Sequence, residues 1–236
     1  MQGNRFSPSL ESKPIREIAY EKLKQAIVDG AIPTGARIVE TEYADLMHIS
    51  RTPLREALRK LERDGLVEYI PRRGVMVRAF TLVDVEEIYT IRNALEMLTL
   101  PAIIANVTGD AISSLREKLR QMDGCMARDA IPELSSLARA FHTELMRISK
   151  LNRILRVIEG QDEYITRFSA LSIAKEPRRQ AAHREHHQLV NLVENGDLNG
   201  FEQLVRKHID RSKETCLAAL HESPLAENVA HKGEVK

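Results

Sequence analysis

Residues 49–77, ISRTPLREALRKLERDGLVEYIPRRGVMV, constrain the fold of this chain more than any other stretch. Four apolar residues recur at i, i+3, i+4 and i+7 and predict one buried helix face: Leu54, Ala57, Leu58 and Leu61. Four arginines recur at every fourth position and predict a second, charged face: Arg51, Arg55, Arg59 and Arg63. A helix that reads DNA bases in the major groove needs such a pair of faces. Taken alone, this pattern is more typical of a solvated surface helix, so the neighbouring sequence has to decide.

The sequence before this helix predicts two further helices. Helical periodicity begins near residue 15 and ends at Asp29-Gly30, where glycine can close the helix in the left-handed conformation. A shorter helix is expected over residues 41–47, with three side chains in the core: Tyr43, Leu46 and Met47.

The sequence after the basic helix predicts a β-hairpin. Two short apolar segments flank residues 72–74, Arg-Arg-Gly, which form a basic tip small enough to approach a phosphate or the minor groove closely. Three helices followed by a hairpin define a winged helix-turn-helix over residues 14–78. Ser50 or Thr52 is expected to cap the basic helix.

Positive charge is concentrated around this basic helix, although the net charge of the chain is only +1. Residues 1–78 hold 14 Lys/Arg against 11 Asp/Glu, and residues 50–78 hold 8 against 4. Such local basicity suits a compact nucleic-acid footprint. The longest uncharged apolar run, near residues 98–105, is too short to span a bilayer, and residues 1–13 lack the apolar stretch of a signal peptide. We therefore expect a cytoplasmic protein with no membrane partner.

The rest of the chain predicts an all-helical domain. Aromatic residues make up only 4% of the chain and tryptophan is absent, so aliphatic side chains must build the core. Six helices are expected: residues 83–106, 111–128, 131–149, 152–174, 178–195 and 199–221. With a flexible leader (1–13), a linker (79–82) and a flexible tail (223–236), the chain is mainly α, a winged helix-turn-helix followed by an all-α six-helix bundle over residues 83–222. The two cysteines are expected to be reduced thiols: Cys125 and Cys216.

Three histidines of this bundle are candidates for a metal site. His186 and His208 each lie eleven residues from Asp197, in the turn between the last two helices, so they should face each other across the hairpin. Both lie on apolar faces, as does His142. Three imidazoles that converge inside a bundle suit a divalent first-row metal, although each histidine alone is more often a core residue than a ligand. Two neighbouring histidines are expected to be solvated: His183 and His187.

The run SRTPLREALRKLERDGLVEYIPRRGVMV resembles the DNA-binding module of the GntR family of bacterial transcription regulators, over about residues 14–78. The resemblance implies four operator contacts: Arg51, Thr52, Arg55 and Gly74. Four further candidates complete the DNA-binding set: Arg37 and Arg59 at phosphates, Ser50 at the helix start and Arg72 at the hairpin tip. The sequence departs from the family pattern at two positions: His48 replaces a usual Gly, and Thr34 replaces a common Pro. The usual Gly implies a left-handed turn, which His48 can adopt at a small cost in strain.

Residues 82–221 resemble FCD, the all-helical effector domain of the FadR-type branch of that family. The family pattern has an Asp and a His four apart, a His preceded by Glu, and another His twenty-two residues further on. Three positions fit this pattern: His142, Glu185-His186 and His208. Ala138 stands in the place of the Asp. The resemblance therefore implies a divalent metal ion such as zinc on three histidines. The missing carboxylate leaves three alternatives open: weaker binding, a ligand set completed by water or by an effector carboxylate, or no metal.

Two arginines are candidates for binding a small carboxylate effector. Arg92 corresponds to an arginine near the start of the family's effector domain and could hold a carboxylate in a bidentate pair. A structural pair with Glu96, four residues further on, is the more expected alternative. Arg167 is a candidate from its place in the helix after Asn152.

These patterns together predict a dimeric, ligand-responsive transcription regulator that binds a palindromic double-stranded operator, more readily as a repressor than as an activator. Two half-sites related by a two-fold axis require a matching homodimer. Two alternatives stay open. In the first, the helical domain serves dimerisation alone; in the second, the three histidines activate water in a metal-dependent hydrolase. No enzyme activity is expected, because the sequence has no HExxH motif and Ala138 removes the nearby carboxylate.

Overall fold

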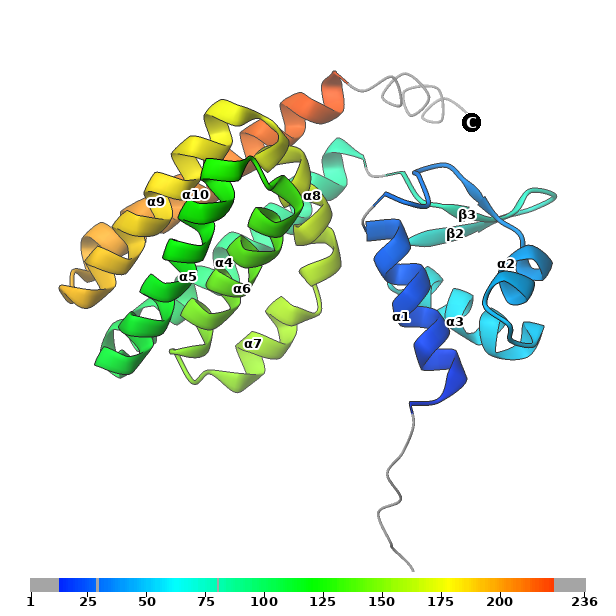
Figure 1. Ribbon diagram of the computed structural model, residues 1–236, viewed down its shortest axis with the longest axis horizontal. Helices are drawn as coiled ribbons and strands as arrows, with labels where there is room; N and C mark the ends of the chain where they lie inside the picture. Colours follow the sequence, from blue (N-terminus) through cyan, green and yellow to red (C-terminus); the bar gives the residue numbers. More distant parts are fainter. Residues whose placement is uncertain (1–12, 29, 80, 223–236) are drawn as a thin grey trace, which may run out of the picture. The chain divides into compact units, whose positions relative to one another are not determined.

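The computed structural model describes residues 13–28, 30–79 and 81–222 (Figure 1). The chain divides into two compact units, Met1–Ala79 and Phe80–Lys236, and each unit has its own hydrophobic core. Nearly all of the expected leader (1–13) and the whole of the expected tail (223–236) lie outside the described residues.

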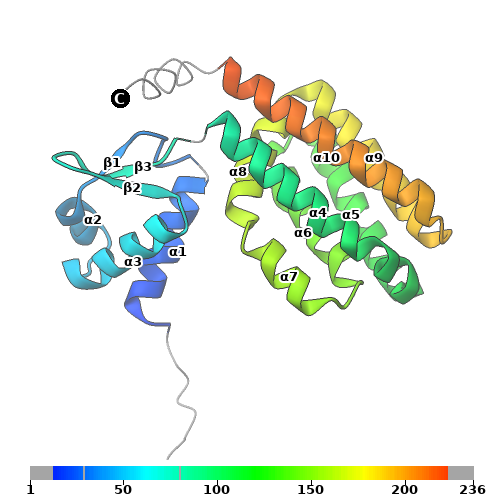
Figure 2. The same cartoon turned by 180° about the vertical axis from the view of Figure 1, so that it is seen from behind.

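The first unit is a three-helix domain with a small antiparallel sheet, which confirms the predicted winged helix-turn-helix (Figure 2). Its elements are α1 (Ile15–Val28), β1 (Arg37–Ile38), α2 (Glu40–Leu46), α3 (Arg51–Arg63), β2 (Val67–Ile70) and β3 (Gly74–Val77). The strand order is β1-β3-β2. The register places Arg37 opposite Met76 and Tyr69 opposite Val75, so the β2–β3 hairpin forms the wing.

The leucine face of α3 is buried in the core of this unit. Leu54 and Leu61 are both 0% exposed, which confirms the stripe predicted from their spacing. Three side chains of α1 belong to the same core: Tyr20, Leu23 and Ile27. Because a helix turns by about 100° per residue, burial of this face fixes which residues of α3 point to solvent.

The short helix α2 places a smaller residue in the core than the sequence predicts. Ala44 is 2% exposed, whereas Leu46 is 74% exposed, and Tyr43 and Met47 are partly buried. Two helical residues separated by two positions lie on nearly opposite sides of a helix. With Ala44 facing the core, Leu46 must therefore face solvent, and the prediction for Leu46 was wrong.

His48 adopts the left-handed conformation expected of it, with a φ of 54°. Its N–H donates to the carbonyl of Asp45, and the N–H of Ile49 donates to the carbonyl of Ala44. These two bonds close α2 and turn the chain toward α3. A residue with a Cβ in this conformation costs about 1–2 kcal/mol, which the packing of the two helices has to offset.

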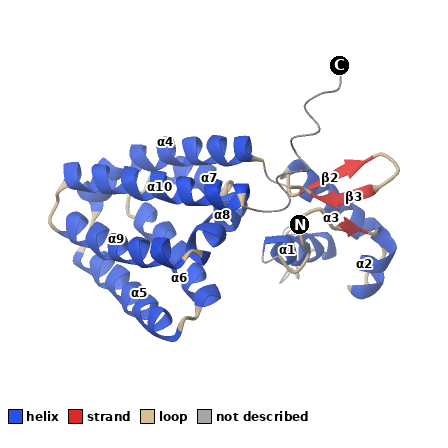
Figure 3. Cartoon of the chain, turned by 90° about the horizontal axis from the view of Figure 1, so that it is seen from above, coloured by secondary structure: helices blue, strands red, loops and turns tan. Residues whose placement is uncertain are grey.

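The second unit is a helical bundle (Figure 3). Its helices are α4 (Leu82–Asn106), α5 (Gly109–Arg128), α6 (Ile131–Arg147), α7 (Asn152–Glu159), α8 (Asp162–Ala174), α9 (Glu176–Glu194) and α10 (Leu198–His221). The antiparallel α9–α10 hairpin lies where the sequence predicts it, and α4 packs along α10. Its described residues therefore form seven helices, not the predicted six.

The extra helix arises because the expected helix over residues 152–174 is broken. The helix α7 ends at Glu159, Gly160 serves as its C-cap, and α8 begins at Asp162. A Cβ on Gly160 would lie 3.3 Å from the carbonyl oxygen of Val157, so the chain passes tightly here. The apolar periodicity continues across the break, which is why the sequence alone did not reveal it.

The core of the bundle is built around three phenylalanines that are 0% exposed: Phe141, Phe168 and Phe201. Both cysteines are buried and free, as expected: Cys125 and Cys216. Within the described residues, no helix combines the length and the apolar character needed to cross a membrane.

Shortening a core leucine of α3 should destabilise the first unit far more than shortening an exposed leucine of α2. Leu61→Ala should lower the opening free energy by about 2–5 kcal/mol, because it leaves a cavity in a fully buried site. The matched change Leu46→Ala should alter it by less than about 0.5 kcal/mol. Native-state hydrogen exchange of the α3 amides measures both values separately from the stability of the bundle. Equal effects of the two changes would contradict this account of the core.

Candidate functional site

The charged face of α3 is exposed at its start. Arg51, Thr52, Arg55 and Arg59 are all exposed, and the first turn of the helix has no acidic residue. Ser50 is the N-cap, as expected, but its side chain makes no capping hydrogen bond. The positive end of the helix dipole, two hydroxyl side chains and the guanidinium groups therefore lie together. This combination suits the binding of backbone phosphates.

Arg55 is held in place by an acidic residue from the preceding helix. Its Nε and Nη2 lie 3.1 and 2.8 Å from Oε2 of Glu40, the first residue of α2. This hydrogen bonding lowers the pKa of Glu40 below its usual value, so the carboxylate stays ionised. The Arg55 side chain is still 53% exposed. A guanidinium that is both oriented and accessible can donate to the edge of a guanine without a large loss of side-chain entropy.

The wing brings together the remaining candidate residues of the first unit. Gly74 has a φ of 83° and Arg72 a φ of 67°, so both adopt the left-handed conformation at the hairpin. Arg37 extends from β1 beside Gly74, since a Cβ on that glycine would lie 3.7 Å from Nε of Arg37. Arg37 and Arg72 are exposed. The wing thus presents a basic edge on a tight turn.

The second unit contains a cavity of about 70 Å³ lined by the three candidate histidines. His142 comes from α6, His186 from α9 and His208 from α10. One ring nitrogen from each of the three lies within 4.8 Å of those of the other two, and Nε2 of His142 is 3.1 Å from Nε2 of His186. The hairpin symmetry seen in the sequence therefore identified residues that the fold brings together.

Burial keeps the three imidazoles neutral. It lowers the pKa of His142 and of His186 well below the usual value, and the nearby histidines add to the effect. Burial also lowers the pKa of His208, although the hydrogen bond with Glu185 offsets part of this shift. Neutral imidazoles have free lone pairs, and this is the form in which histidine binds metal ions.

A buried network fixes the orientation of His208. Its Nδ1–H donates to Oε2 of Glu185 at 2.7 Å, which turns Nε2 toward the cavity. Arg178 donates to the same Glu185 oxygen at 2.8 Å and to Oγ of Ser212 at 2.9 Å. Arg211 donates to Oε1 of Glu185 at 2.7 Å. Burial would raise the pKa of Glu185, but these hydrogen bonds and charges outweigh it and lower that pKa to about 2.

The donor set fits a divalent metal ion. Two nitrogen ligands about 2.1 Å from one ion, at angles of about 90–110°, lie roughly 3.0–3.4 Å apart, close to the separation between His142 and His186. The carboxylate behind His208 is the outer partner that metal-binding histidines usually have. Ala138 lines the same cavity and is buried, so its methyl group provides no ligand. A metal ion bound here would have three imidazole ligands and open coordination positions.

Arg92 also lines this cavity, and it is paired with Glu96. The Arg92 Nε lies 2.5 Å from Oε1 of Glu96, and both side chains are buried, so the structural pair expected four residues along α4 is present. Both residues line the cavity. The side chain of Arg167, the other effector candidate, lies outside the described residues.

Four residues of these sites were not identified by sequence reasoning: Glu40, Arg178, Arg211 and Ser212. Glu40 and Arg55 are 15 positions apart, and Arg178 and Ser212 are 34 apart, so no helical spacing connects them. For Arg178 the available signal was its charge, because an arginine on a buried helix face requires a partner. The half-exposed Glu40 and the uncharged Ser212 gave no such signal.

Each of the two units matches a known protein family. Residues 15–77 match the family described as bacterial regulatory proteins, gntR family, and residues 87–211 match the FCD domain. The HTH-type transcriptional regulator YdhC of Bacillus subtilis is 29% identical over 204 residues, which cover 86% of this chain and 91% of YdhC. The HTH-type transcriptional repressor RspR of Escherichia coli is 24% identical over 204 residues, 86% of this chain and 90% of RspR. Among solved structures, Escherichia coli McbR/YncC has the same fold, with a TM-score of 0.74 and 18% identity over 88% of this chain and 99% of that chain.

Removing Arg178 should destabilise the bundle strongly. Arg178→Ala leaves the buried Glu185 carboxylate without one of its charge partners, and breaking a buried pair in this way costs about 3–5 kcal/mol. Arg120→Ala removes an exposed ion pair with Glu117 and should cost less than about 1 kcal/mol. Urea unfolding followed by the helical circular dichroism signal checks both values, and similar midpoints for the two variants would contradict the role given to Arg178.

Proposed function

Because the chain belongs to the GntR family of bacterial regulatory proteins and carries an FCD effector domain, we propose that this DNA-binding transcription regulator is a ligand-responsive repressor. In this proposal it binds a palindromic operator as a homodimer, and a small organic acid bound in the histidine-lined cavity changes its affinity for DNA. The observation that carries the proposal is the buried leucine face of α3, which leaves Arg55 exposed and oriented by Glu40.

In the proposed DNA complex, the start of α3 enters the major groove. Arg51, Thr52 and Arg55 lie on its first turns and reach base edges or the adjoining phosphates. Ser50 and Arg59 flank them on the same helix and contact the backbone. Three residues of the wing and of the strand beside it provide the remaining contacts: Arg37, Arg72 and Gly74.

An exposed apolar stripe on α4 supports the proposed homodimer. Val83, Ile91 and Leu98 are 63%, 41% and 62% exposed, and their spacing of seven or eight residues places them on one side of the helix. A single transcription regulator that reads two half-sites needs a two-fold axis, and an isologous contact buries the same stripe of both copies. We therefore assign a second copy of this chain to the stripe.

A divalent ion on His142, His186 and His208 would provide a Lewis-acidic position for an anionic ligand. Glu185 keeps His208 in the tautomer that such an ion needs. Because Ala138 provides no carboxylate, the three neutral imidazoles leave the ion's full positive charge uncompensated, which favours an effector that brings its own carboxylate. We propose zinc as the ion.

Arg92 is the second anchor proposed for the effector. Its pairing with Glu96 lets a buried arginine line the cavity without an unpaired charge. A carboxylate effector would compete with Glu96 for Arg92, so binding would move α4, which carries both residues. An effector can change DNA affinity only through such a difference between two arrangements of the protein.

The carboxylate that lines the cavity favours a regulator without enzyme activity. Among the described residues, Glu96 is the only carboxylate that lines the cavity, and it is engaged by Arg92. A metal-dependent hydrolase needs an acid/base group beside the open coordination position.

Replacing Arg55 tests DNA reading directly. Arg55→Ala should weaken binding to the specific operator by about 1–3 kcal/mol relative to unrelated DNA, because a bidentate base contact is lost. Arg63→Ala removes the same charge at the far end of α3 and should weaken binding to both DNAs equally. Fluorescence anisotropy at fixed salt measures these affinities. An equal loss on all DNA for Arg55→Ala would make it a phosphate contact and contradict base reading.

Metal analysis tests the histidine site. Protein purified without a histidine tag and dialysed against zinc should hold one ion fewer per chain in His208→Ala than in the wild type. The control His221→Ala changes an exposed histidine of α10 and should keep the wild-type content. Identical zinc contents in all three proteins would remove the site from the proposal.

A carboxylate screen tests the effector assignment. The true effector should raise the melting temperature of the wild type, because it binds only the folded protein. The double variant Arg92→Met, Glu96→Met removes both buried charges together and so should stay folded, but it should lose the response. If no carboxylate stabilises the wild type, the helical domain serves dimerisation alone.

A further inference from the structure

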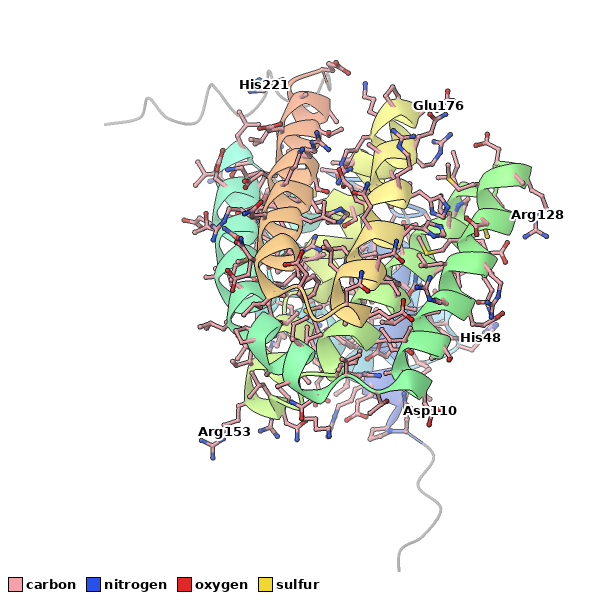
Figure 4. The ribbon with its side chains drawn as sticks, turned by 90° about the vertical axis from the view of Figure 1, so that its left-hand side faces the viewer. His48, Asp110, Arg128, Arg153, Glu176 and His221 are labelled. Atoms are coloured by element: carbon pink, nitrogen blue, oxygen red, sulfur yellow. The ribbon has the colours of Figure 1, made fainter. Side chains whose placement is uncertain are left out.

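A second cluster of metal-ligating side chains lies on the bundle, outside the histidine-lined cavity. It consists of Asp123 on α5 and of His183 and His187 on α9. Figure 4 shows the two helices side by side, α5 between the labelled Asp110 and Arg128 and α9 beginning at the labelled Glu176. Because His183 and His187 are four residues apart, both rings lie on the face of α9 that meets α5.

The two imidazoles converge on a single oxygen atom. Nε2 of His183 lies 2.6 Å and Nε2 of His187 lies 3.1 Å from Oδ1 of Asp123. The rings are nearly perpendicular, with an interplanar angle of 88° and centroids 5.0 Å apart. One candidate ligand atom from each of the three residues therefore points into the same small volume.

The setting of the cluster is that of a binding site more than of a solvated surface. The side chain of His183 is only 13% exposed, although the sequence predicted it to be solvated, and that of His187 is 41% exposed. In the described part of the chain no lysine or arginine is paired with Asp123; the two histidines are its partners. The carboxylate charge is thus available to a cation held between the two rings.

From this geometry we propose a second metal site, in which Asp123, His183 and His187 bind a late first-row divalent cation such as Zn²⁺. Two imidazoles and one carboxylate form a ligand set that such ions accept, and the exposed side of the cluster leaves coordination positions for water. In the metal-bound form each neutral imidazole carries its proton on Nδ1, so that the lone pair of Nε2 is free for the ion. Asp123 is 50% exposed, so its side chain can shift by the few tenths of an ångström that coordination requires.

This outer site would tie α9 to α5. Glu185 and His186 lie between His183 and His187 in the sequence, and both are buried. An ion at the outer site would therefore hold in place the helix that carries residues of the inner cavity. The outer site has its own three ligands and does not depend on whether the inner cavity binds metal.

The experiment counts zinc ions. Untagged full-length protein is freed of metal with a chelator and titrated with ZnCl₂ at neutral pH in a calorimeter, with the bound metal measured after dialysis. Asp123→Asn keeps a hydrogen-bond acceptor but removes the anionic ligand, and His187→Ala removes a partly exposed ring. Each should bind one Zn²⁺ fewer than the wild type, or bind it at least about tenfold more weakly. Zn²⁺ should also raise the melting temperature of these variants less than that of the wild type.

Two further variants make the outcomes distinct. His208→Ala reports on the inner cavity and should leave the outer ion in place, so loss of one site can be told from loss of the other. His221→Ala removes an exposed histidine at the end of α10, labelled in Figure 4, and should behave like the wild type. Unchanged stoichiometry and affinity in both Asp123→Asn and His187→Ala would overturn the proposal. An equal loss in His221→Ala would also overturn it, because the binding would then be nonspecific.

Discussion

The burial of one side of α3 is the constraint on which the DNA-binding face depends. Leu54 and Leu61 are fully buried, so the core fixes the rotation of the helix about its own axis. The arginines on its other face must therefore point to solvent. Glu40 then restricts Arg55 further, through a bidentate contact from α2. A flexible side chain on a fixed helix loses less entropy on binding when it is already oriented. The short helix α2 thus contributes to recognition through a carboxylate as well as through the turn at His48.

In the interior of the bundle, carboxylates also orient basic side chains, but here the charges are buried. Arg178, Glu185 and the ring of His208 form one hydrogen-bonded group, and Arg92 and Glu96 form another. Buried ion pairs contribute little net stability compared with apolar residues of the same size. Their presence around one cavity is better explained by what they do there, since each holds a polar group ready to face a ligand. A cavity wall that carries a paired arginine such as Arg92 can exchange an internal partner for an external one at small cost.

Much of the fold could be predicted from the sequence, because helical and strand periodicity are local properties. The leucine stripe of α3 and the hairpin that opposes His186 to His208 follow from spacing within one or two elements, whereas the left-handed His48 was expected from the family resemblance. The predictions that were wrong concern features that depend on the packing of elements against one another. Leu46 lies outside the core because α3 sets the rotation of α2, and the break at Gly160 interrupts a continuous apolar pattern. Contacts between distant elements, such as Glu40 with Arg55 or Asp123 with His183, have no signature in spacing and become visible only when the helices are packed.

The central claim is that α3 reads a specific DNA sequence as part of a two-fold assembly. The most direct measurement is selection by the full-length protein from a pool of random duplex DNA, followed by sequencing of the retained molecules. The account predicts enrichment of one short motif repeated in inverted orientation at a fixed spacing. Retention of DNA without any enriched sequence, or enrichment of a motif with no inverted repeat, would contradict it.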